Sequence, residues 1–189
     1  MKTMQEKVLF LQKFSRQPRM IGSITPSSSF LANAMLRSIP WGQVNAVAEL
    51  GAGTGAITKR LGQYAEEPTK VLLFEQEPEL FHKLKIQYPS YDIHPDARFL
   101  TQTLQKSGID GLDCIISGLP FYNFPQLMRD QLMKQIHSSL KPGGMFVAFQ
   151  YSLQMRRQFS SYFEMERIRF MPLNIPPAFI YICRKRKDA

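Results

Sequence analysis

The chain has 189 residues, a length that predicts one domain with at most a short appendage. Its formal charge of +9 favours an anionic partner, either nucleic acid or an acidic membrane surface, although solubility alone can also explain a basic surface. No run approaches the roughly 20 apolar residues of a membrane span, and no signal-peptide pattern opens the chain. The two cysteines lie in apolar runs and the three histidines are scattered, so we expect reduced core thiols and no metal site.

Residues 1–25 are expected to form an amphipathic helix and a loop ahead of the main domain. Apolar residues recur in this helix at helical spacing, at Met4, Val8, Leu11 and Phe14. Basic and amide side chains fall on the opposite side, so the helix could lie in the plane of an anionic membrane surface or pack on the core. Proline at position 26, directly after Thr25, predicts the start of a second helix over residues 26–37.

Residues 44–50 form a short apolar run that predicts a buried parallel strand, and a glycine-rich turn follows it directly. The turn reads Gly51-Ala52-Gly53-Thr54-Gly55, and a helix over residues 56–61 comes next. Glycines let the backbone turn sharply and approach a ligand with no Cβ atom in the way. Strand, glycine turn and helix form a nucleotide-binding unit, in which an acidic residue at the end of the next strand holds a ribose. Glu75, after the apolar run at residues 71–74, has that position.

The other predicted elements are short and follow in chain order. They are a helix at 78–88, a strand near 91–93, a turn at 94–97, a strand at 112–117, a helix at 126–140, a strand at 145–151, a short segment around 155–161 and strands at 163–170 and 178–183. The strand at 112–117 delivers the loop from Gly118 to Pro125 to the carboxyl edge of the sheet, where open α/β sheets bind ligands.

The sequence from Glu49 to Gly55 departs from the dinucleotide-binding fingerprint in its glycine spacing and resembles motif I of class I S-adenosylmethionine-dependent methyltransferases. The resemblance implies an α/β fold over residues 26–189, with a Rossmann-like seven-stranded sheet, helices on both faces and the last strands antiparallel. It also implies S-adenosylmethionine as the cofactor. The implied cofactor residues are Glu49, Gly51, Ala52, Gly53, Thr54, Gly55, Glu75, Gln76, Asp96, Ala97 and Ser117.

For two of these residues, Glu75 and Asp96, we expect contacts with a particular part of the cofactor. Glu75 would hold both ribose hydroxyls, as the resemblance implies. Asp96 would meet the adenine amino group, but an Asp in a proline-containing turn is equally typical of purely local hydrogen bonding.

Four further segments resemble the bacterial phospholipid N-methyltransferases, which methylate phosphatidylethanolamine. They are residues 16–28, 117–125, 149–152 and 174–178, in the expected order along nearly the whole chain. The resemblance implies direct displacement, in which a lipid amine takes the sulfonium methyl group and S-adenosylhomocysteine leaves. The implied substrate-binding and catalytic residues are Thr25, Ser27, Leu119, Pro120, Phe121, Tyr122 and Tyr151.

Each of these residues suits its implied role chemically, and several could instead have a purely structural role. Thr25 and Ser27 lie at the start of a helix, where hydroxyl and free N–H groups can bind a lipid phosphate. The loop from Gly118 to Pro125 is rigid and apolar, which suits a substrate floor or packing against the next helix. Tyr151 could accept the proton of the amine, hold the methylated cation against its ring, or be a structural tyrosine at a strand end.

The ribosomal RNA adenine dimethyltransferases are the alternative family. Their motif after the fourth strand reads Asn-Leu-Pro followed by an aromatic residue, whereas this chain has Gly118 in place of the Asn. They also carry a helical RNA-binding domain, for which this chain is expected to be too short. The sequence therefore favours a lipid acceptor, a cytoplasmic protein and peripheral attachment to the inner face of the membrane through residues 1–18. A small amine acceptor, or cofactor binding without catalysis, stays open.

Overall fold

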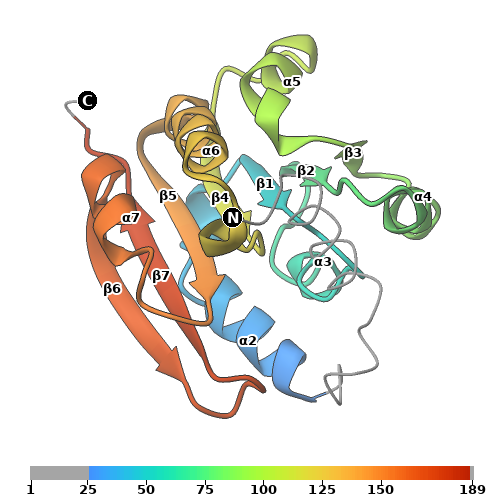
Figure 1. Cartoon of the computed structure of the whole chain (residues 1–189). Coiled ribbons are helices and arrows are strands. Elements are labelled where there is room, and N and C mark those ends of the chain that lie inside the picture. Colours follow the sequence, from blue (N-terminus) through green and yellow to red (C-terminus); the bar gives the residue numbers. More distant parts are fainter. Residues whose placement is uncertain (1–25, 188–189) are drawn as a thin grey trace.

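The structure is a computed structural model that describes residues 26–187, with the side chains of residues 29–187. The predicted N-terminal helix, the loop after it and Thr25 lie outside the described residues. Within residues 26–187, seven strands form one sheet in the order β3-β2-β1-β4-β5-β7-β6 (Figure 1).

The elements have the following bounds. The strands are β1 (Ala46–Leu50), β2 (Lys70–Phe74), β3 (Asp92–His94), β4 (Leu112–Ser117), β5 (Leu140–Gln150), β6 (Glu164–Met171) and β7 (Ala178–Arg184). The α-helices are α2 (Pro26–Leu36), α3 (Thr58–Leu61), α4 (Pro78–Gln87), α5 (Leu100–Lys106), α6 (Gln126–Ser139) and α7 (Arg156–Tyr162). Short 3-10 helices are η1 (Trp41–Gln43), η2 (Ala97–Phe99) and η3 (Phe121–Asn123).

The sheet is mixed. Strands β1 to β5 run parallel, and β7 is antiparallel to both of its neighbours, β5 and β6. This arrangement confirms the predicted α/β sheet of seven strands with an antiparallel pair at its end. The strand order reverses between β1 and β4, and such a reversal opens a ligand crevice beyond the carboxyl ends of the strands.

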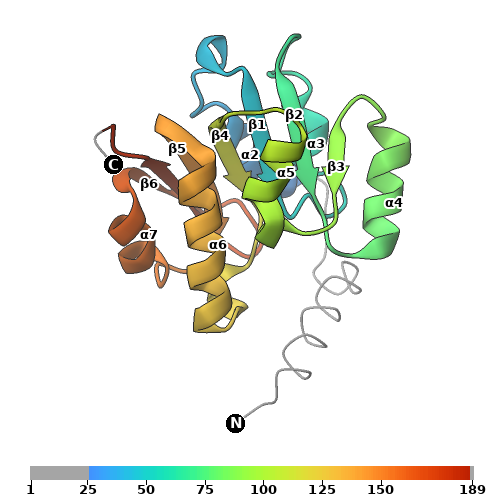
Figure 2. The same ribbon diagram turned by 90° about the horizontal axis from the view of Figure 1, so that it is seen from above.

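Helices cover both faces of the sheet. Helices α2, α3 and α4 pack on one face and α5, α6 and α7 on the other, and Figure 2 shows the sheet between the two layers. Successive side chains of a strand point to opposite faces of the sheet. Val47 therefore packs in the core on the side of α2, α3 and α4, whereas Ala48 and Leu50 pack in the core on the side of α5, α6 and α7. Burial on both faces explains why the central strands have nearly continuous apolar sequences.

The largest differences from the predicted elements concern β5 and α5. Strand β5 begins at Leu140 instead of residue 145, because the residue that follows β7, Lys185, still forms hydrogen bonds with this early part of β5. Gly143 N–H donates to the Lys185 carbonyl oxygen (3.0 Å), and Lys185 N–H donates to the Gly144 carbonyl oxygen (2.9 Å). Helix α5 was not predicted, because its seven residues are too few to show a helical period.

A cluster of aromatic rings on the α7 side supports the loop after β4. The ring of Phe121 lies 6.2 Å from that of Phe146 and 5.4 Å from that of Phe159, in edge-to-face contacts. Phe159 also lies 5.1 Å from Tyr181 of β7, and the Tyr181 hydroxyl donates to the Ser152 carbonyl oxygen (2.9 Å). All four rings are fully buried, so the loops after β4 and β5 rest on one aromatic core.

Strand β1 buries one carboxyl group. Glu49 has no exposed surface, and Thr58 Oγ1 donates to its Oε2 (2.8 Å), while its Oε1 has no hydrogen-bond partner among the described residues. Burial removes water from the charged form, and this effect, with a smaller one from the nearby charge of Glu75, outweighs the Thr58 bond and raises the pKa of Glu49 to about 8. Glu49 is therefore mostly protonated at neutral pH.

Replacing Glu49 with Gln is expected to flatten the dependence of stability on pH. The folded-state pKa of about 8 exceeds the ordinary value of 4.5, so the folded protein binds more protons than the unfolded chain between these values. The free energy of unfolding of the wild type should therefore fall as the pH rises through this window. Each pKa unit corresponds to about 1.4 kcal/mol, so the effect is of the order of a few kcal/mol. Denaturant unfolding across the window measures it, and equal slopes for both proteins would contradict the expectation.

Replacing Phe121 with Ala is expected to lower the free energy of unfolding by roughly 3–5 kcal/mol, the usual cost of emptying a buried phenylalanine site. Tyr122→Ala is the matched control, since Tyr122 is the next residue and is exposed. Its change should stay within about 0.5 kcal/mol, as for most surface substitutions. Denaturant unfolding compares the two, and a loss for Phe121→Ala as small as the roughly 0.5 kcal/mol expected of Tyr122→Ala would contradict the expectation.

Candidate functional site

The glycine turn after β1 is anchored to the end of β2. The N–H groups of Gly51 and Ala52 both donate to the carbonyl oxygen of Phe74, at 2.8 and 3.1 Å. Gly51, Gly53 and Gly55 have φ angles of 75°, 58° and 80°, in the left-handed region that favours glycine. The turn therefore needs glycine at these three positions, as the sequence predicted.

Glu75 closes the turn from the second strand. Gly53 N–H donates to Glu75 Oε2 (2.7 Å), and Glu77 N–H donates to Glu75 Oε1 (2.8 Å). The carboxylate is thus held at the carboxyl edge of the sheet and directly beside the glycine turn. Glu77 in turn accepts from Leu80 N–H (2.8 Å) and caps α4, so the segment after β2 is ordered on both sides of Glu75. A fixed carboxylate at this place is what a ribose-binding site requires.

Asp96 has local partners after β3. Its Oδ1 accepts from Arg98 N–H (2.9 Å) and caps η2, and both carboxylate oxygens accept from the Arg98 guanidinium. The hydrogen bonds that Arg98 donates to the Asp96 carboxylate raise the pKa of Arg98, so this ion pair persists at physiological pH. Asp96 therefore makes local contacts of the kind expected for an Asp in a proline-containing turn. Its contact with adenine, and that of the adjacent Ala97, stay predictions.

The loop after β4 is tied to both neighbouring strands. Gly118 N–H donates to the carbonyl oxygen of Leu50 (2.9 Å), and Ser117 Oγ, which is buried, accepts from Leu119 N–H (3.2 Å). A Cβ atom on Gly51 would come within 2.9 Å of Leu119 Cδ2, and one on Gly118 within 3.0 Å of the Gly51 carbonyl oxygen. The loops after β1 and β4 are therefore in direct contact, and glycine allows their close approach.

Gln150, at the end of β5, was not predicted as a site residue. Its side chain is buried, and its Nε2 donates to the carbonyl oxygen of Leu119 (2.8 Å) and to that of Phe149 (2.6 Å). It thereby orients the carbonyl group of Leu119, which precedes Pro120 in the loop predicted to receive the substrate. A polar residue at the end of the apolar run 145–149 is the sequence signal that could have identified it.

The structure corrects the prediction for Phe121. Its ring is fully buried in the aromatic core described above, so it has no surface for a substrate in this structure. The next residue, Tyr122, is instead 54% exposed. The alternation arises because η3 begins at Phe121 and turns consecutive side chains in different directions.

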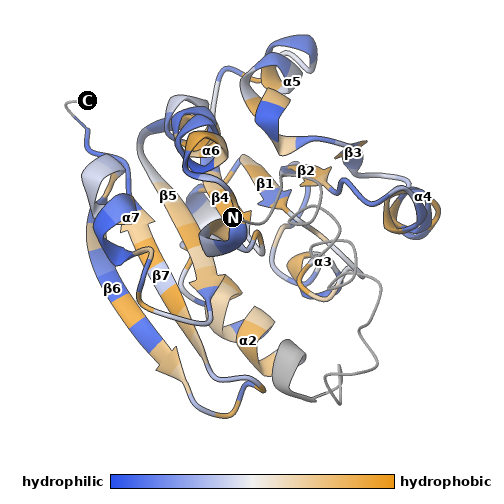
Figure 3. Cartoon of the chain, viewed as in Figure 1, coloured by the Kyte–Doolittle hydropathy of each residue, from blue (hydrophilic) through white to orange (hydrophobic). Residues whose placement is uncertain are grey.

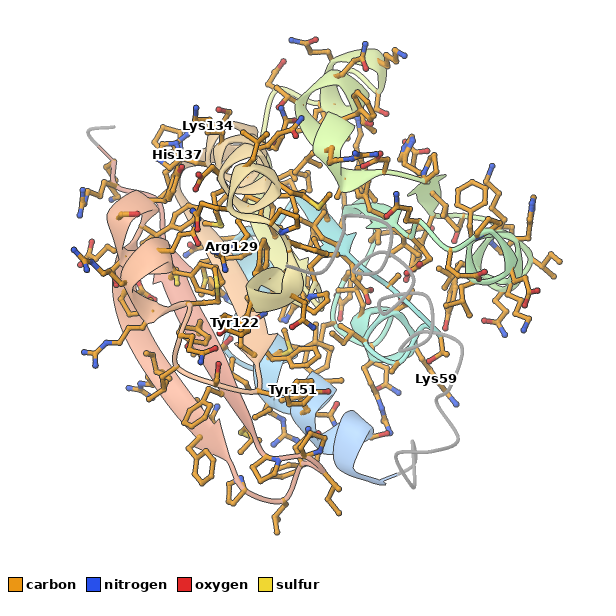
Figure 4. All side chains as sticks on the ribbon, in the orientation of Figure 1. Lys59, Tyr122, Arg129, Lys134, His137 and Tyr151 are labelled. Atoms are coloured by element: carbon orange, nitrogen blue, oxygen red, sulfur yellow. The ribbon has the colours of Figure 1, made fainter. Side chains whose placement is uncertain are left out.

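Tyr151 follows β5 at the same edge of the sheet and is 47% exposed (Figure 4). Its ring contacts that of Phe149 edge to face, with 5.7 Å between centroids. Desolvation raises the pKa of the Tyr151 hydroxyl above its ordinary value of 10, so the residue is a neutral phenol at physiological pH. The arrangement offers an aromatic ring and a hydrogen-bond donor, and it disfavours a phenolate that accepts a proton.

The remaining predicted residues differ in their exposure. Ala52 is buried beneath the turn, whereas Thr54 and Gln76 are exposed in the loops after β1 and β2. Ser27 lies in α2, but its side chain, like Thr25, is outside what the structure describes. Because β1 to β4 are parallel, the predicted residues in the loops after these strands lie at one edge of the sheet (Figure 1).

Among residues 26–187, no group of three or more His, Cys, Asp or Glu residues is placed to hold a metal ion. No helix in this part of the chain has the length and apolarity needed to cross a bilayer. Cys114 and Cys183 are free and buried, which confirms them as core thiols.

Comparisons with known proteins agree with this geometry. A family model described as a methyltransferase domain matches residues 47–144. The sequence is 34% identical to the ornithine lipid N-methyltransferase of Singulisphaera acidiphila, over 98% of this chain and 100% of that protein.

Two solved structures illustrate the shared fold. The N-methyltransferase NodS from Bradyrhizobium japonicum WM9, in complex with S-adenosyl-L-homocysteine, has a TM-score of 0.71 at 14% identity, covering 95% of this chain and 98% of that one. The 1,6-didemethyltoxoflavin-N1-methyltransferase of Burkholderia thailandensis also has a TM-score of 0.71 at 14% identity, covering 98% and 92%. The domain match and the full-length relative show that this chain belongs to the S-adenosylmethionine-dependent methyltransferases, with S-adenosylmethionine as its cofactor.

Proposed function

We propose that this enzyme transfers a methyl group to the primary amine in the head group of a membrane lipid. The observation that carries the proposal is its similarity, over 98% of this chain and 100% of the relative, to an ornithine lipid N-methyltransferase. The four segments that resemble phospholipid N-methyltransferases support it, and they point to phosphatidylethanolamine. Ornithine and ethanolamine head groups share a primary amine close to an anionic group, so both lipids are candidate substrates.

The residues at the carboxyl edge fit the cofactor, which supplies an electrophilic sulfonium methyl group when bound. Glu75 would hold the ribose hydroxyls, because each of its oxygens spends one acceptor position on a backbone N–H and keeps another. Gly53 would allow close approach to the backbone, since a Cβ atom there would meet nothing within 4 Å. Thr54, Gln76 and the turn around Asp96 would complete the cofactor side of the site.

The loop after β4 would prepare the amine. An amine must be neutral to accept a methyl group, and an alkylammonium group has a pKa of about 10 in water. Leu119 and Pro120 are partly buried and apolar, so they would exclude water and lower the pKa of the bound ammonium. We assign to the neutral ring of Tyr151 a cation–π contact with the methylated product, in place of a role as proton acceptor.

An RNA adenine is the competing acceptor. Methylation of a base requires its removal from the stack and hydrogen bonds to its edge. The position that carries an Asn amide in the RNA enzymes is Gly118 here, and its N–H is already bonded to Leu50. The observations therefore favour the lipid.

Glu75→Gln is expected to weaken S-adenosylmethionine binding at least tenfold. The amide keeps one acceptor oxygen but turns an NH₂ group toward a backbone N–H that now donates to the carboxylate. Titration calorimetry measures the affinity. Glu79→Gln, an exposed carboxylate in the first turn of α4, is the matched control and should bind like the wild type. Unchanged affinity of Glu75→Gln would remove Glu75 from the cofactor site.

Incubation with S-adenosylmethionine labelled in its methyl group identifies the acceptor class. We expect label in vesicles that contain ornithine lipid or phosphatidylethanolamine, and the ratio of the two rates gives the preference. Ribosomal RNA and small amines serve as the other pools. Label confined to RNA or to small amines would overturn the lipid proposal, and so would the absence of turnover with every pool despite cofactor binding.

Deletion of residues 1–18 tests the membrane role that the sequence suggests for this segment. We expect the deletion to reduce sedimentation with anionic vesicles, because basic amphipathic helices bind such surfaces. The affinity for S-adenosylmethionine should not change, since the cofactor residues lie between 49 and 117. Sedimentation equal to that of the full chain would exclude this segment as a membrane anchor.

A further inference from the structure

Exposed large apolar side chains of the described residues are concentrated at one edge of the sheet. Ten such side chains are exposed, and eight of them lie at the carboxyl ends of strands, in the loops that follow, or in the first turn of the next helix. The eight are Phe99, Tyr122, Leu127, Tyr151, Leu153, Phe170, Leu173 and Ile175. This edge also carries the cofactor loops, so the apolar surface and the site face the same way.

The turn between β6 and β7 contributes the most prominent pair. Leu173 is 70% exposed and Ile175 is 64% exposed, while Asn174 between them is buried. Asn174 Nδ2 donates to the Pro176 carbonyl oxygen (2.7 Å), and its backbone N–H donates to the Met171 carbonyl oxygen (3.3 Å). Asn174 thus holds the turn from inside while its two neighbours project outward. The exposure of Leu173 and Ile175 is a property of an ordered turn.

Strand pairing places this turn beside the loop after β5. Gln150 at the end of β5 pairs with Phe179, and Met171 pairs with Ala178, so the turn lies beyond the carboxyl end of β5. Tyr151, which we assigned to the methylated product, follows directly after Gln150. Figure 3 shows hydrophobic residues at the end of the β6–β7 hairpin. An occupant of the turn would therefore be close to the substrate side of the site.

Basic side chains lie just behind the turn. Arg169 and Arg167 are exposed on β6, two and four residues before its end at Met171, which corresponds to roughly 7 and 13 Å along the strand. Neither takes part in an ion pair among the described residues. An open groove continues from the apolar end of the hairpin, lined among others by Leu153, Phe170 and Arg167. An apolar turn with cationic side chains at these distances behind it suits a bilayer, in which anionic head groups cover the boundary of the acyl chains.

We propose that the β6–β7 turn, residues 172–177, docks onto an anionic lipid bilayer, with Leu173 and Ile175 in the acyl boundary and Arg167 and Arg169 among the head groups. The proposal deepens the proposed function and rests on it for its purpose, which is to turn the substrate loops toward the bilayer. A second copy of the chain fits less well, because a few side chains expose far less than the roughly 800 Å² per partner of a stable interface.

The test uses the full chain and vesicles of phosphatidylglycerol and phosphatidylcholine, which lack a primary amine and so report docking apart from methylation. Leu173→Ser/Ile175→Ser is expected to lower the vesicle partition coefficient at least tenfold. Ile86→Ser is the matched control and should sediment like the wild type, because Ile86 is 81% exposed but lies near the far end of α4. Arg167→Gln/Arg169→Gln should bind the anionic vesicles more weakly than the wild type, and its remaining binding should depend less on salt. Unchanged sedimentation of the serine variant would overturn the proposal.

Further measurements keep the result interpretable. The serine variant should retain the wild-type affinity for S-adenosylmethionine, which shows that it folds. Leu173→Trp should give a blue-shifted emission that brominated lipids quench, beyond any change from Trp41 in the wild type. Emission that vesicles leave unchanged would overturn docking, as would a dimer in the wild type that the serine variant converts to a monomer. If the turn is needed for docking but no lipid is methylated, only the proposed substrate is rejected. If lipid is methylated but the turn is not needed for docking, only the docking surface is rejected.

Discussion

The site depends on a small set of backbone N–H groups at the end of β1 that find their acceptors at the end of β2. Gly51 and Ala52 share the Phe74 carbonyl oxygen, and Gly53 donates to Glu75. These donors lie in a turn where no strand partner remains, and a buried backbone donor without an acceptor is costly. Leu50 and Phe74 are partners in the parallel register, so the Phe74 carbonyl oxygen and Glu75 lie next to the turn that begins at Gly51.

The same bonds explain why the carboxylate of Glu75 is ordered before any ligand arrives. A side chain that already accepts two backbone hydrogen bonds has lost much of its rotational freedom, so less entropy remains to be lost on binding. The loop after β4 is prepared in a similar way by Gln150, which binds the Leu119 carbonyl oxygen, and by the contact of Gly118 with Gly51. The loops after β1 and β4 are thus fixed relative to one another through the central strands.

Parallel strands also explain why so many apolar side chains are exposed at one edge. Their carboxyl ends meet there, and every loop that follows a strand must expose some residues at the same border. In this protein these loops carry aromatic and aliphatic residues together with the cofactor turn, and the β6–β7 turn joins them because β6 runs parallel to β5. An enzyme whose acceptor lies in a bilayer would need such an edge.

Much of this follows from the sequence, because it depends on neighbours in the chain. Apolar runs bounded by glycine specify the central strands, and only glycine adopts the positive φ angles of the turn without strain. The order of strand, turn and helix, with an acid at position 75, was enough to predict the sheet and the cofactor edge. Other features depended on contacts between distant segments. Only packing against Phe159 decides that Phe121 is buried and Tyr122 exposed.

The early start of β5 likewise requires Lys185, about forty residues further along the chain, and the neutral state of Glu49 requires its complete burial beneath α3. The sequence pattern shows that a residue is apolar, polar or charged, and how often such residues recur. Which partner it meets, how much water surrounds it and therefore which charge it carries are set by the folded chain, because burial and hydrogen bonding are properties of the tertiary structure.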